Sequence, residues 1–600
     1  MITRRRFISI TLMMIALFIL FQGPLLIREQ YNDYRFNKYY EENTLHFNDV
    51  WKGEDTAKEE VIFIGDDENI LSGIKEWANY SKRRVLSFNG IEDGLSACNS
   101  FTKLVIMTPE CWEDENLEDK IHQMMDVGIN VLFTDLPLFS RIQNREAAKI
   151  LGIDDVVLQH IDVDGFRLFE GFFLGGERYF LAKDETEKKR QDLNLKVTWY
   201  RTGQGVETYM MGVFKDDLYK GKKIENEELP PIMWSCSSGT AKAYVIQGDY
   251  FSNRMIEMGI LSSVMADCKQ IDLYPIVDAQ QIQILNYPTL TDENGQKMSD
   301  IYGRSLTQFE RLIVYPGIVA DTDGNGFRFT SYVMPQEDYL DQEGPSDGEL
   351  TWYLSQFNEK KDELGYSLEH NSNISLEEKL KHDTDVFLKE APDYKIAAVY
   401  VTPEEADLFY DILPERLKSS VNTVCTQYFK NKPIIGYINN DVTLQQSTAS
   451  VNAFSYTNDL EMLGIETTLG YASIAIDMKE ILWPEDLDDE WQNASRRIFS
   501  LIDTYWTKFK VFEKTTASET DRKIRNLLSL SYDYSVKENE IRLVLDDNSD
   551  KVSFILRMHN RKVTDVSSGS FKKIEQDVYL ITVDSDISTI KFEEDINFEQ

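Results

Sequence analysis

The 600-residue sequence predicts a multidomain α/β protein that follows an N-terminal transmembrane helix. Three observations lead to this fold class. A long uncharged stretch begins at residue 7, short apolar runs then alternate with amphipathic segments, and β-type runs return near the C-terminus. At roughly 150 residues per domain, the length suggests about three to four domains, which is enough chain for several large cores.

Residues 7–27 contain no charged side chain and form the first predicted element. At a rise of about 1.5 Å per residue they cross a hydrocarbon core of about 30 Å, which predicts a transmembrane helix. The positive-inside rule places the preceding Arg4, Arg5 and Arg6 in the cytoplasm. We therefore expect a single-pass protein of the cell membrane, with residues 1–27 as cytoplasmic tip and anchor and an extracellular bulk. A cleaved signal peptide is the alternative, but no small-x-small motif follows.

We expect five regions after the anchor. Residues 28–57 lack a stable apolar period and are typical of a stalk. Residues 58–157 alternate strand and helix patterns and predict a Rossmann- or flavodoxin-like domain with a parallel sheet. Residues 158–262 read as short strands with turns and predict a β-rich domain. Strand and helix patterns alternate again in residues 263–525. The β-type runs of residues 526–600 predict a C-terminal β domain.

Charge and cysteine usage exclude several functions. The net charge is −38, and an anionic chain cannot neutralise a phosphate backbone, so nucleic acid is not an expected partner. The five cysteines are scattered without a CxxC pair, which argues against a cysteine metal site or a disulfide framework. Residues 65–68 (GDDE) carry acids where a phosphate would bind, and Cys111 lacks the glycines of a nucleophile elbow. We interpret residues 58–157 as a scaffold.

Two segments of the central region are the most informative. In residues 311–329, RLIVYPGIVADTDGNGFRF, we expect an apolar strand that runs into a loop rich in Asp, Asn and Gly. Strand ends of this kind are where α/β proteins build their sites. The second segment, residues 362–370, ends in His370, one of only six histidines.

Together with the domain order, these segments resemble the deacetylase part of PelA and its relatives in Pel-type exopolysaccharide loci. Those proteins belong to the NodB-homology polysaccharide deacetylases. The whole chain is also similar to a family of membrane-anchored Gram-positive proteins encoded beside Pel-like genes. The resemblance implies a distorted (β/α) barrel over residues 263–525, a chemistry that removes N-acetyl groups with a metal-bound water, and a role in exopolysaccharide production.

The resemblance also implies roles for individual residues. The sequence DGNGF matches the first family motif, with Asp323 at the general-base position and Asn325 where a metal-ligating Asp is expected. The sequence YSLEH matches the second motif, with His370 retained and Tyr366 in place of the first histidine. The late catalytic histidine of the family is expected near residues 470–477, where this sequence has none.

These departures predict a degenerate, noncatalytic deacetylase-like domain. An Asn amide and a Tyr phenol are poor zinc ligands, so we expect no bound metal. Without a metal to lower the pKa of its water, Asp323 alone could hardly generate the attacking nucleophile. We expect Asp321, Asp323, Asn325, Tyr366 and His370 to contact polysaccharide instead.

Two alternatives remain open. An active metal-dependent N-deacetylase with an atypical site would use Asp323, Asn325 and His370 as ligands of zinc. Residues 321–326 (DTDGNG) also match the first six positions of an EF-hand calcium loop, which would make the chain a calcium-binding surface protein. The twelfth position of that loop is Tyr332 rather than Glu, and an Asx/Gly turn at a strand end explains the same residues.

The expected partners are the membrane, an exopolysaccharide, and other proteins of exopolysaccharide synthesis or export. A partially deacetylated amino-sugar polymer is cationic, and an acidic extracellular part would attract it. Surface acidity that serves solubility alone explains the same net charge.

Overall fold

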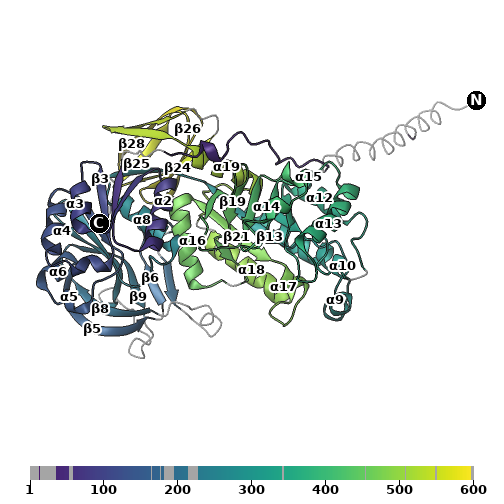
Figure 1. Cartoon of the computed structure of the whole chain (residues 1–600), viewed down its shortest axis with the longest axis horizontal. Helices are drawn as coiled ribbons and strands as arrows, with labels where there is room; N and C mark the ends of the chain where they lie inside the picture. The colour runs from purple at the N-terminus through teal and green to yellow at the C-terminus, as the bar shows by residue number, and fades with distance from the viewer. Residues whose placement is uncertain are drawn as a thin grey trace, which may run out of the picture.

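The computed structural model describes Met13 and residues 35–52, 59–163, 165–175, 178–181, 195–213, 228–340, 343–452, 454–506, 509–546 and 551–595. The predicted transmembrane segment, residues 7–27, therefore lies outside the described residues except for Met13. Within the described part of the chain, no helix has the length and apolar character needed to cross a bilayer. Figure 1 shows an N-terminal α/β body, a central body from teal to green, and a yellow C-terminal β body.

The N-terminal body is built on a nine-stranded sheet with the order β2-β1-β3-β4-β11-β10-β9-β6-β7. The first five strands in that order run parallel: β2 (Arg84–Phe88), β1 (Glu60–Ile64), β3 (Thr102–Met107), β4 (Asn130–Phe133) and β11 (Ala241–Ile246). Helices α2 (Glu68–Tyr80), α3 (Ile91–Ala97) and α4 (Leu117–Asp126) connect the first four strands of the chain. Strands β1 and β4 are buried along their whole length, as expected for a parallel sheet covered on both faces.

The antiparallel part of the same sheet comes from residues 158–262. Its strands are β10 (Pro231–Ser238), β9 (Val206–Val213), β6 (Gly165–Leu168) and β7 (Arg178–Leu181). The β-rich region expected here is thus an extension of the first sheet, because β11 pairs with the otherwise unpaired edge of β4. Outside this sheet, β5 (Ile153–Val163) and β8 (Leu195–Thr202) form a two-stranded ribbon.

Helix α8 (Arg254–Asp267) joins the N-terminal body to the central body. It packs against α2 on one side and against α16 (Tyr456–Leu469) on the other, and both α8 and α16 are almost entirely buried. The backbones of the two helices touch where Gly259 meets Gly464. A Cβ atom built on Gly464 would lie 2.3 Å from the carbonyl oxygen of Met255. The two bodies are therefore held by a close helix crossing that only small residues permit.

The central body contains a barrel of parallel strands in the order β17-β16-β15-β14-β13-β21. One chain segment joins the two ends of this sheet, because its first part, β19, pairs with β17 and its second part, β20, pairs with β21. This closure produces a distorted barrel, as the resemblance implies. The strands are β13 (Ala279–Leu285), β14 (Phe329–Val333), β15 (Glu363–Ser367), β16 (Ala398–Tyr400), β17 (Thr423–Thr426), β19 (Thr443–Gln446), β20 (Ala449–Ser450) and β21 (Tyr471–Asp477), and β18 (Ile435–Tyr437) adds antiparallel to β19.

Helices surround the barrel: α9 (Gly295–Tyr302), α10 (Leu306–Phe309), α11 (Tyr315–Asn325), α12 (Glu349–Lys360), α13 (Leu376–Glu390), α14 (Phe409–Ile412), α15 (Glu415–Lys418), α17 (Lys479–Leu482) and α18 (Trp491–Trp506). The apolar run expected to be a strand is helical, since a π-helical segment at Glu310–Val314 continues directly into α11. The strand prediction was wrong because Val314 and Ile318, four residues apart, face the core while Leu312 is exposed.

Helix α19 (Ala517–Ser529) closes the barrel at the end where the strands begin. The Ala517 amide donates to Thr330 Oγ1 at 2.8 Å, and the Ser518 amide donates to Glu363 Oε2 at 3.0 Å. The buried Glu363 carboxylate thus faces the positive N-terminal end of the helix. The opposite end of the barrel, at the C-terminal ends of the strands, is its mouth. Functional sites of α/β barrels are formed at this end.

The C-terminal body is a sandwich of two four-stranded antiparallel sheets, and its apolar core includes Phe554, Ile581 and Phe592. One sheet has the order β12-β24-β27-β26, so a strand that precedes the barrel in sequence completes it. The strands are β12 (Ile271–Ile276), β22 (Tyr532–Lys537), β23 (Glu540–Leu545), β24 (Val552–Met558), β25 (Arg561–Val566), β26 (Gly569–Glu575), β27 (Val578–Val583) and β28 (Ile587–Glu594).

Residues 35–52, part of the expected stalk, run along the barrel rim where the strands begin. The contacts are Asn37 Nδ2 to the Lys395 carbonyl (3.0 Å), the Tyr39 hydroxyl to the Lys361 carbonyl, Asn422 Nδ2 to the Glu41 carbonyl (2.9 Å) and the Phe47 amide to the Asn440 carbonyl (3.0 Å). The barrel residues in these contacts lie just before β16, β15, β17 and β19. This segment, which we call the rim segment, is thus fixed to the folded domain.

Candidate functional site

The residues of the first predicted motif lie in the last turns of α11. Gly326 ends this helix in the left-handed conformation, with a φ of 72°, and its amide donates to the Asp323 carbonyl. Asn325 Nδ2 donates to the Asp321 carbonyl at 3.2 Å. The six residues that resemble the start of a calcium loop therefore form a helix C-terminus, which does not have the geometry of an EF-hand loop.

Asp323 is also distant from the barrel mouth. Its carboxylate pairs with Lys360 Nζ at 2.7 Å, and its side chain is 50% exposed. Both residues precede the strands β14 and β15, so they lie at the end of the barrel where strands begin. This position does not fit a general base of a barrel enzyme, whose site is formed at the opposite end.

Tyr366 points away from the barrel interior. Its hydroxyl donates to Asp383 on α13 at 2.7 Å, and Asp383 also accepts from Lys379 Nζ at 2.8 Å and from the Tyr339 hydroxyl at 2.6 Å. Lys379 and Asp383 are buried, so this network compensates their charges inside the protein. Tyr366 thus links β15 to α13.

His370 lies just beyond the C-terminal end of β15. Its Nδ1 is 3.2 Å from the Leu368 carbonyl, and its Nε2 is 3.8 Å from Glu405 Oε1. Of the five residues expected to form one site, His370 alone lies at the barrel mouth. The structure therefore does not bring Asp321, Asp323 and Asn325 together with His370.

The barrel mouth instead gathers three polar residues around the amide of Asn286, which follows β13. Asn286 Nδ2 donates to Glu369 Oε2 at 2.8 Å and to Asp477 Oδ1 at 3.2 Å. Asn286 Oδ1 accepts from Ser367 Oγ at 2.7 Å, which orients the amide with its nitrogen toward the carboxylates. Because one nitrogen contacts both carboxylates, the two contacting oxygens lie close together, in a pair supplied by β15 and β21.

A lysine completes this cluster. Lys479 Nζ lies 2.8 Å from Glu337 Oε1 and 3.4 Å from Glu369 Oε1. Burial opposes its charge, but the two glutamates raise the pKa of Lys479 above its ordinary value. The residue therefore stays cationic at neutral pH. We refer to Asn286, Glu337, Glu369, Asp477 and Lys479 as the mouth cluster.

Asp477 is the most perturbed carboxylate of the mouth cluster. Burial raises its pKa to about 6, and the negative charge of Glu369 contributes in the same direction, while the Lys479 amide opposes the shift. Burial also raises the pKa of Tyr400 well above its ordinary value, with further contributions from Glu369 and Asp477, so its phenol stays protonated. Perturbed groups of this kind concentrate at functional sites.

Asn452 holds the backbone of Asp477 in place. Its Oδ1 accepts from the Asp477 amide at 3.1 Å, and its Nδ2 donates to the Asp477 carbonyl at 3.1 Å. The same Nδ2 donates to Glu480 at 2.9 Å. Asn452, which follows β20, therefore fixes the position of the last residue of β21. Functional sites are commonly supported by such hydrogen bonds to the residues that form them.

The mouth cluster does not fit the metal site of a polysaccharide deacetylase. Within the described residues, no group of three or more His, Cys, Asp and Glu side chains could hold a metal ion. Asn286 presents an amide nitrogen, which is not a metal ligand, and the Lys479 ammonium lies where it would repel a divalent cation. The carboxylates and the amide of the mouth cluster are therefore better suited to bind an ammonium or hydroxyl group than a metal ion.

Asn286, Glu369 and Asp477 were not predicted as site residues from the sequence, although each lies at or just beyond a strand end. Glu369 is a neighbour of His370 in the second motif, and Asp477 ends the segment where a late histidine was expected. The available signal was position, because a polar residue at or just after the C-terminal end of a barrel strand lies at the mouth.

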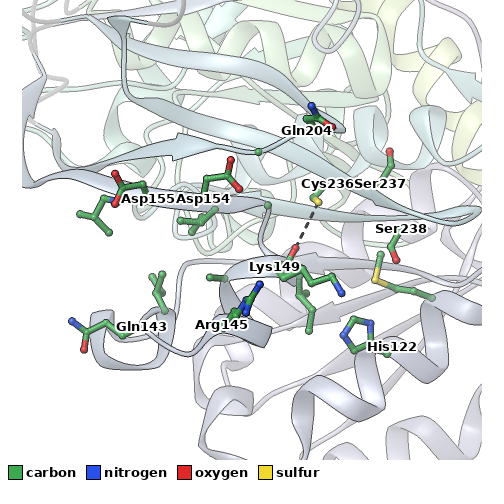
Figure 2. Close-up of a pocket in the computed structure, with 18 of the residues that line it drawn as sticks. His122, Gln143, Arg145, Lys149, Asp154, Asp155, Gln204, Cys236, Ser237 and Ser238 are labelled. Atoms are coloured by element: carbon green, nitrogen blue, oxygen red, sulfur yellow. Dashed lines mark hydrogen bonds between the residues drawn. The ribbon is translucent and has the colours of Figure 1, made fainter.

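The N-terminal body contains a separate cavity of about 700 Å³. Figure 2 shows His122, Arg145 and Lys149 on helices at one side, Cys236 on a strand above them, and the Cys236 Sγ contact to the Lys149 carbonyl (3.8 Å). Arg145 and Lys149 are exposed, as ordinary surface cations are, and we assign no ligand to this cavity. Cys111 lies elsewhere, where burial raises its thiol pKa to about 11, which does not suit a nucleophile.

No family model and no curated protein matches this chain. Among solved structures, the chain is similar to Agd3, described as a novel carbohydrate deacetylase, with a TM-score of 0.50 and 8% identity over 89% of this chain and 98% of that one. Two further solved structures are too distant to carry an argument. One is a putative ThuA-like protein from Bacteroides uniformis, with a TM-score of 0.21 and 11% identity over 36% of this chain and 93% of that one. The other is a β-galactosidase from Rahnella sp. R3, with a TM-score of 0.22 and 12% identity over 36% of this chain and 34% of that one. At this identity the likeness to Agd3 concerns the fold alone: the described chain has a carbohydrate-deacetylase-like fold.

Proposed function

We propose that this chain is a membrane-anchored extracellular protein of Pel-type exopolysaccharide production whose deacetylase-like barrel binds or guides polysaccharide without deacetylating it. The observation that carries the proposal is the composition of the mouth cluster. Where a deacetylase needs three metal ligands, the described residues supply an amide, carboxylates and a lysine ammonium. Polymer-export or polymer-synthesis proteins are the partners that this role requires.

The mouth cluster has the chemistry to bind an amino sugar. Glu337 and Glu369 already pair with one ammonium, that of Lys479, and a glucosamine unit carries the same group. Hydrogen bonds to charged groups are about twice as strong as neutral ones, so the carboxylates favour deacetylated over acetylated sugar units. The net charge of −38 adds long-range attraction for such a polymer.

Binding by the full chain in lipid nanodiscs tests this proposal, with hexamers of glucosamine and of N-acetylglucosamine as probes. We expect the glucosamine hexamer to bind at least about tenfold more tightly, and this preference to fall with salt. The double variant Glu369→Gln/Asp477→Asn should lose most of the preference. Asp323→Asn, which removes a carboxylate at the other end of the barrel, is the matched control and should bind like wild type. Equal affinity of wild type for both hexamers would refute the proposal.

The alternative of an active deacetylase with an atypical site is favoured by one observation, the pKa of Asp477 near 6, which suits a general base. Acetate release from the N-acetylglucosamine hexamer, measured with and without added zinc or calcium, separates the two functions. We expect no release in either case. Release that is abolished by Asp477→Asn and unaffected by Asp323→Asn would establish the enzyme, with its site at the mouth.

The anchored topology has its own test. Protease added to intact cells that express the full chain should shed a fragment of nearly full length, because residues 28–600 are proposed to lie outside. A tag placed before Arg4 should remain protected. Complete protection of the whole chain in cells whose envelope admits the protease would reverse the proposed orientation.

A further inference from the structure

A second cavity, of about 550 Å³, lies on the outer side of the barrel, at the rim where the strands begin. Its volume falls in the range of ligand sites, about 300–1,000 Å³. Its walls come from β15, α13, the segment before β16, and α15. The mouth cluster contributes nothing to its lining, so the cavity is distinct from the candidate functional site. We refer to it as the rim cavity.

The walls of the rim cavity are largely apolar. Phe387, Tyr394, Ile396 and Leu417 are buried side chains that line it, together with Tyr366. Tyr366 and Phe387 pack edge to face with ring centroids 5.3 Å apart, and the Tyr366 hydroxyl is used by Asp383. A polar ligand would find few free hydrogen-bonding groups along these walls, whereas an apolar chain would bury against carbon.

The rim segment contributes to the lining of the rim cavity. Phe36, Asn37 and Tyr40 line the cavity, and Tyr40 reaches the Ser419 carbonyl at 3.4 Å. The Lys395 Nζ lies 4.1 Å from the centre of the Tyr40 ring. Phe36 is 63% exposed, an unusual state for a phenylalanine beside an apolar cavity.

Two cations line the rim cavity, and neither forms an ion pair within the described part of the chain. Lys395 is exposed and contacts the ring of Tyr40. Arg416 donates through Nη2 to the carbonyls of Ala391 and Pro392, and its Nη1 has no hydrogen-bond partner. The cavity is also lined by Asp383, which Lys379 neutralises, and by the exposed Asp393. In a chain of net charge −38, two cations without carboxylate partners favour an anion.

We propose that the rim cavity binds a single-chain anionic amphiphile, a long-chain fatty acid in its simplest form. The acyl chain would lie against the apolar walls, and the carboxylate would lie near Lys395 and Arg416. Binding itself does not depend on the function proposed above. The supply of such a lipid does rest on it, because the rim segment begins eight residues after the proposed transmembrane helix ends.

The test uses the full chain in nanodiscs of zwitterionic lipid, a palmitate that carries a diazirine near its chain end, and peptide mapping of the cross-links. We expect labels in the peptides that contain residues 384–396 and 414–420. Competition by unlabelled fatty acids should weaken about fourfold for each methylene removed between palmitate and laurate, since each buried methylene contributes about 0.8 kcal/mol. Palmitate methyl ester, which lacks the charge, should compete at least about fivefold more weakly.

Four variants make the result specific. Thr384→Trp places a large ring in the cavity and should abolish labelling of these peptides, and Ser419→Trp at the exposed edge is a second filling variant in case the first does not fold. Arg416→Gln should reduce labelling several-fold. Lys418→Gln removes a cation of the same helix α15 that does not line the cavity, and it should label like wild type. Labelling that persists in a folded filling variant, or that spreads evenly over the surface, would overturn the proposal whatever the hexamer-binding result.

Discussion

At the scale of single residues, Asp477 of the mouth cluster lowers the stability of the folded protein when its carboxylate is ionised. Its pKa in the folded protein is about 6, above the ordinary value of 3.8, mainly because of burial. The folded state therefore binds this proton more tightly than the unfolded state does. The contribution of Asp477 to stability is most favourable at pH values below about 4, and it is lost as the pH rises to about 6.

This residue yields the first prediction. Asp477→Asn removes the charge but keeps the oxygen that accepts from Asn286 and from the Lys479 amide, so it should stabilise the barrel above pH 6 by up to about 3 kcal/mol. Near pH 4 the variant and wild type should unfold alike. Thermal melts at pH 4 and pH 8 measure both differences, and a variant that melts below wild type at pH 8 would contradict the assignment. Asp323→Asn loses a half-exposed ion pair and should change stability by less than about 1 kcal/mol at either pH.

The second prediction concerns the family motifs. Asn325→Asp combined with Tyr366→His would restore an Asp and two histidines if these residues faced one site. In the structure Asn325 is the last residue of α11, at the end of the barrel where the strands begin. Tyr366 points outward to Asp383. The double variant should therefore gain no zinc affinity in isothermal titration. A tenfold gain in a correctly folded double variant, absent from both single variants, would mean that the two positions converge after all.

At the scale of elements, the alternation of strands and helices in the N-terminal body could be predicted because apolar runs such as VIFI at residues 61–64 are short and bounded by turn residues. The helix over residues 310–325 could not. Its apolar run is rich in β-branched residues, and the Gly-rich end that reads as a strand-end loop is also the common end of a helix.

The mouth cluster could not be predicted from the sequence because the interior of the barrel is polar. Strand β13 buries Gln280, Gln281 and Gln283 completely, and Gln283 Nε2 donates to Ser473 Oγ at 2.7 Å. A strand that alternates Gln with Ile reads as half-exposed, although here both faces are buried. Only the pairing of β13 with β14 and β21 shows that Asn286 follows a central strand.

The third prediction tests the helix crossing of α8 and α16. Gly464→Ala places a methyl group against the backbone oxygen of Met255, which cannot move aside as a flexible side chain would. We expect a loss of more than about 2 kcal/mol, measured as a lower urea midpoint of unfolding. The matched control is Gly324→Ala in α11, where a new Cβ meets nothing within 4 Å. There helix propensity should stabilise the protein by up to about 1 kcal/mol. Equal midpoints for the two variants would show that the crossing tolerates a side chain.

At the scale of the whole molecule, the rim segment sets how the barrel would sit on a membrane. Only residues 28–34 separate the proposed helix from the rim segment, and seven residues span at most about 25 Å when fully extended. The rim segment then passes the starts of β15, β16, β17 and β19 in contacts that fix it to the barrel. If the proposed anchor spans the membrane, we expect the rim end of the barrel to face the bilayer and the mouth cluster to face away from it.

The fourth prediction measures this orientation with two glutamates from the same βα unit. Glu404 is exposed in the loop after β16, on the mouth side, and Glu415 is exposed in α15, which leads back to the rim. A donor dye introduced through an unnatural amino acid at either position, in the full chain in nanodiscs with acceptor-labelled lipid, reports its distance from the bilayer. Transfer should be clearly more efficient from position 415 than from position 404. The reverse order would place the mouth against the membrane, where a polymer leaving an export pore could not reach the mouth cluster from outside, and binding would then have to occur at another surface.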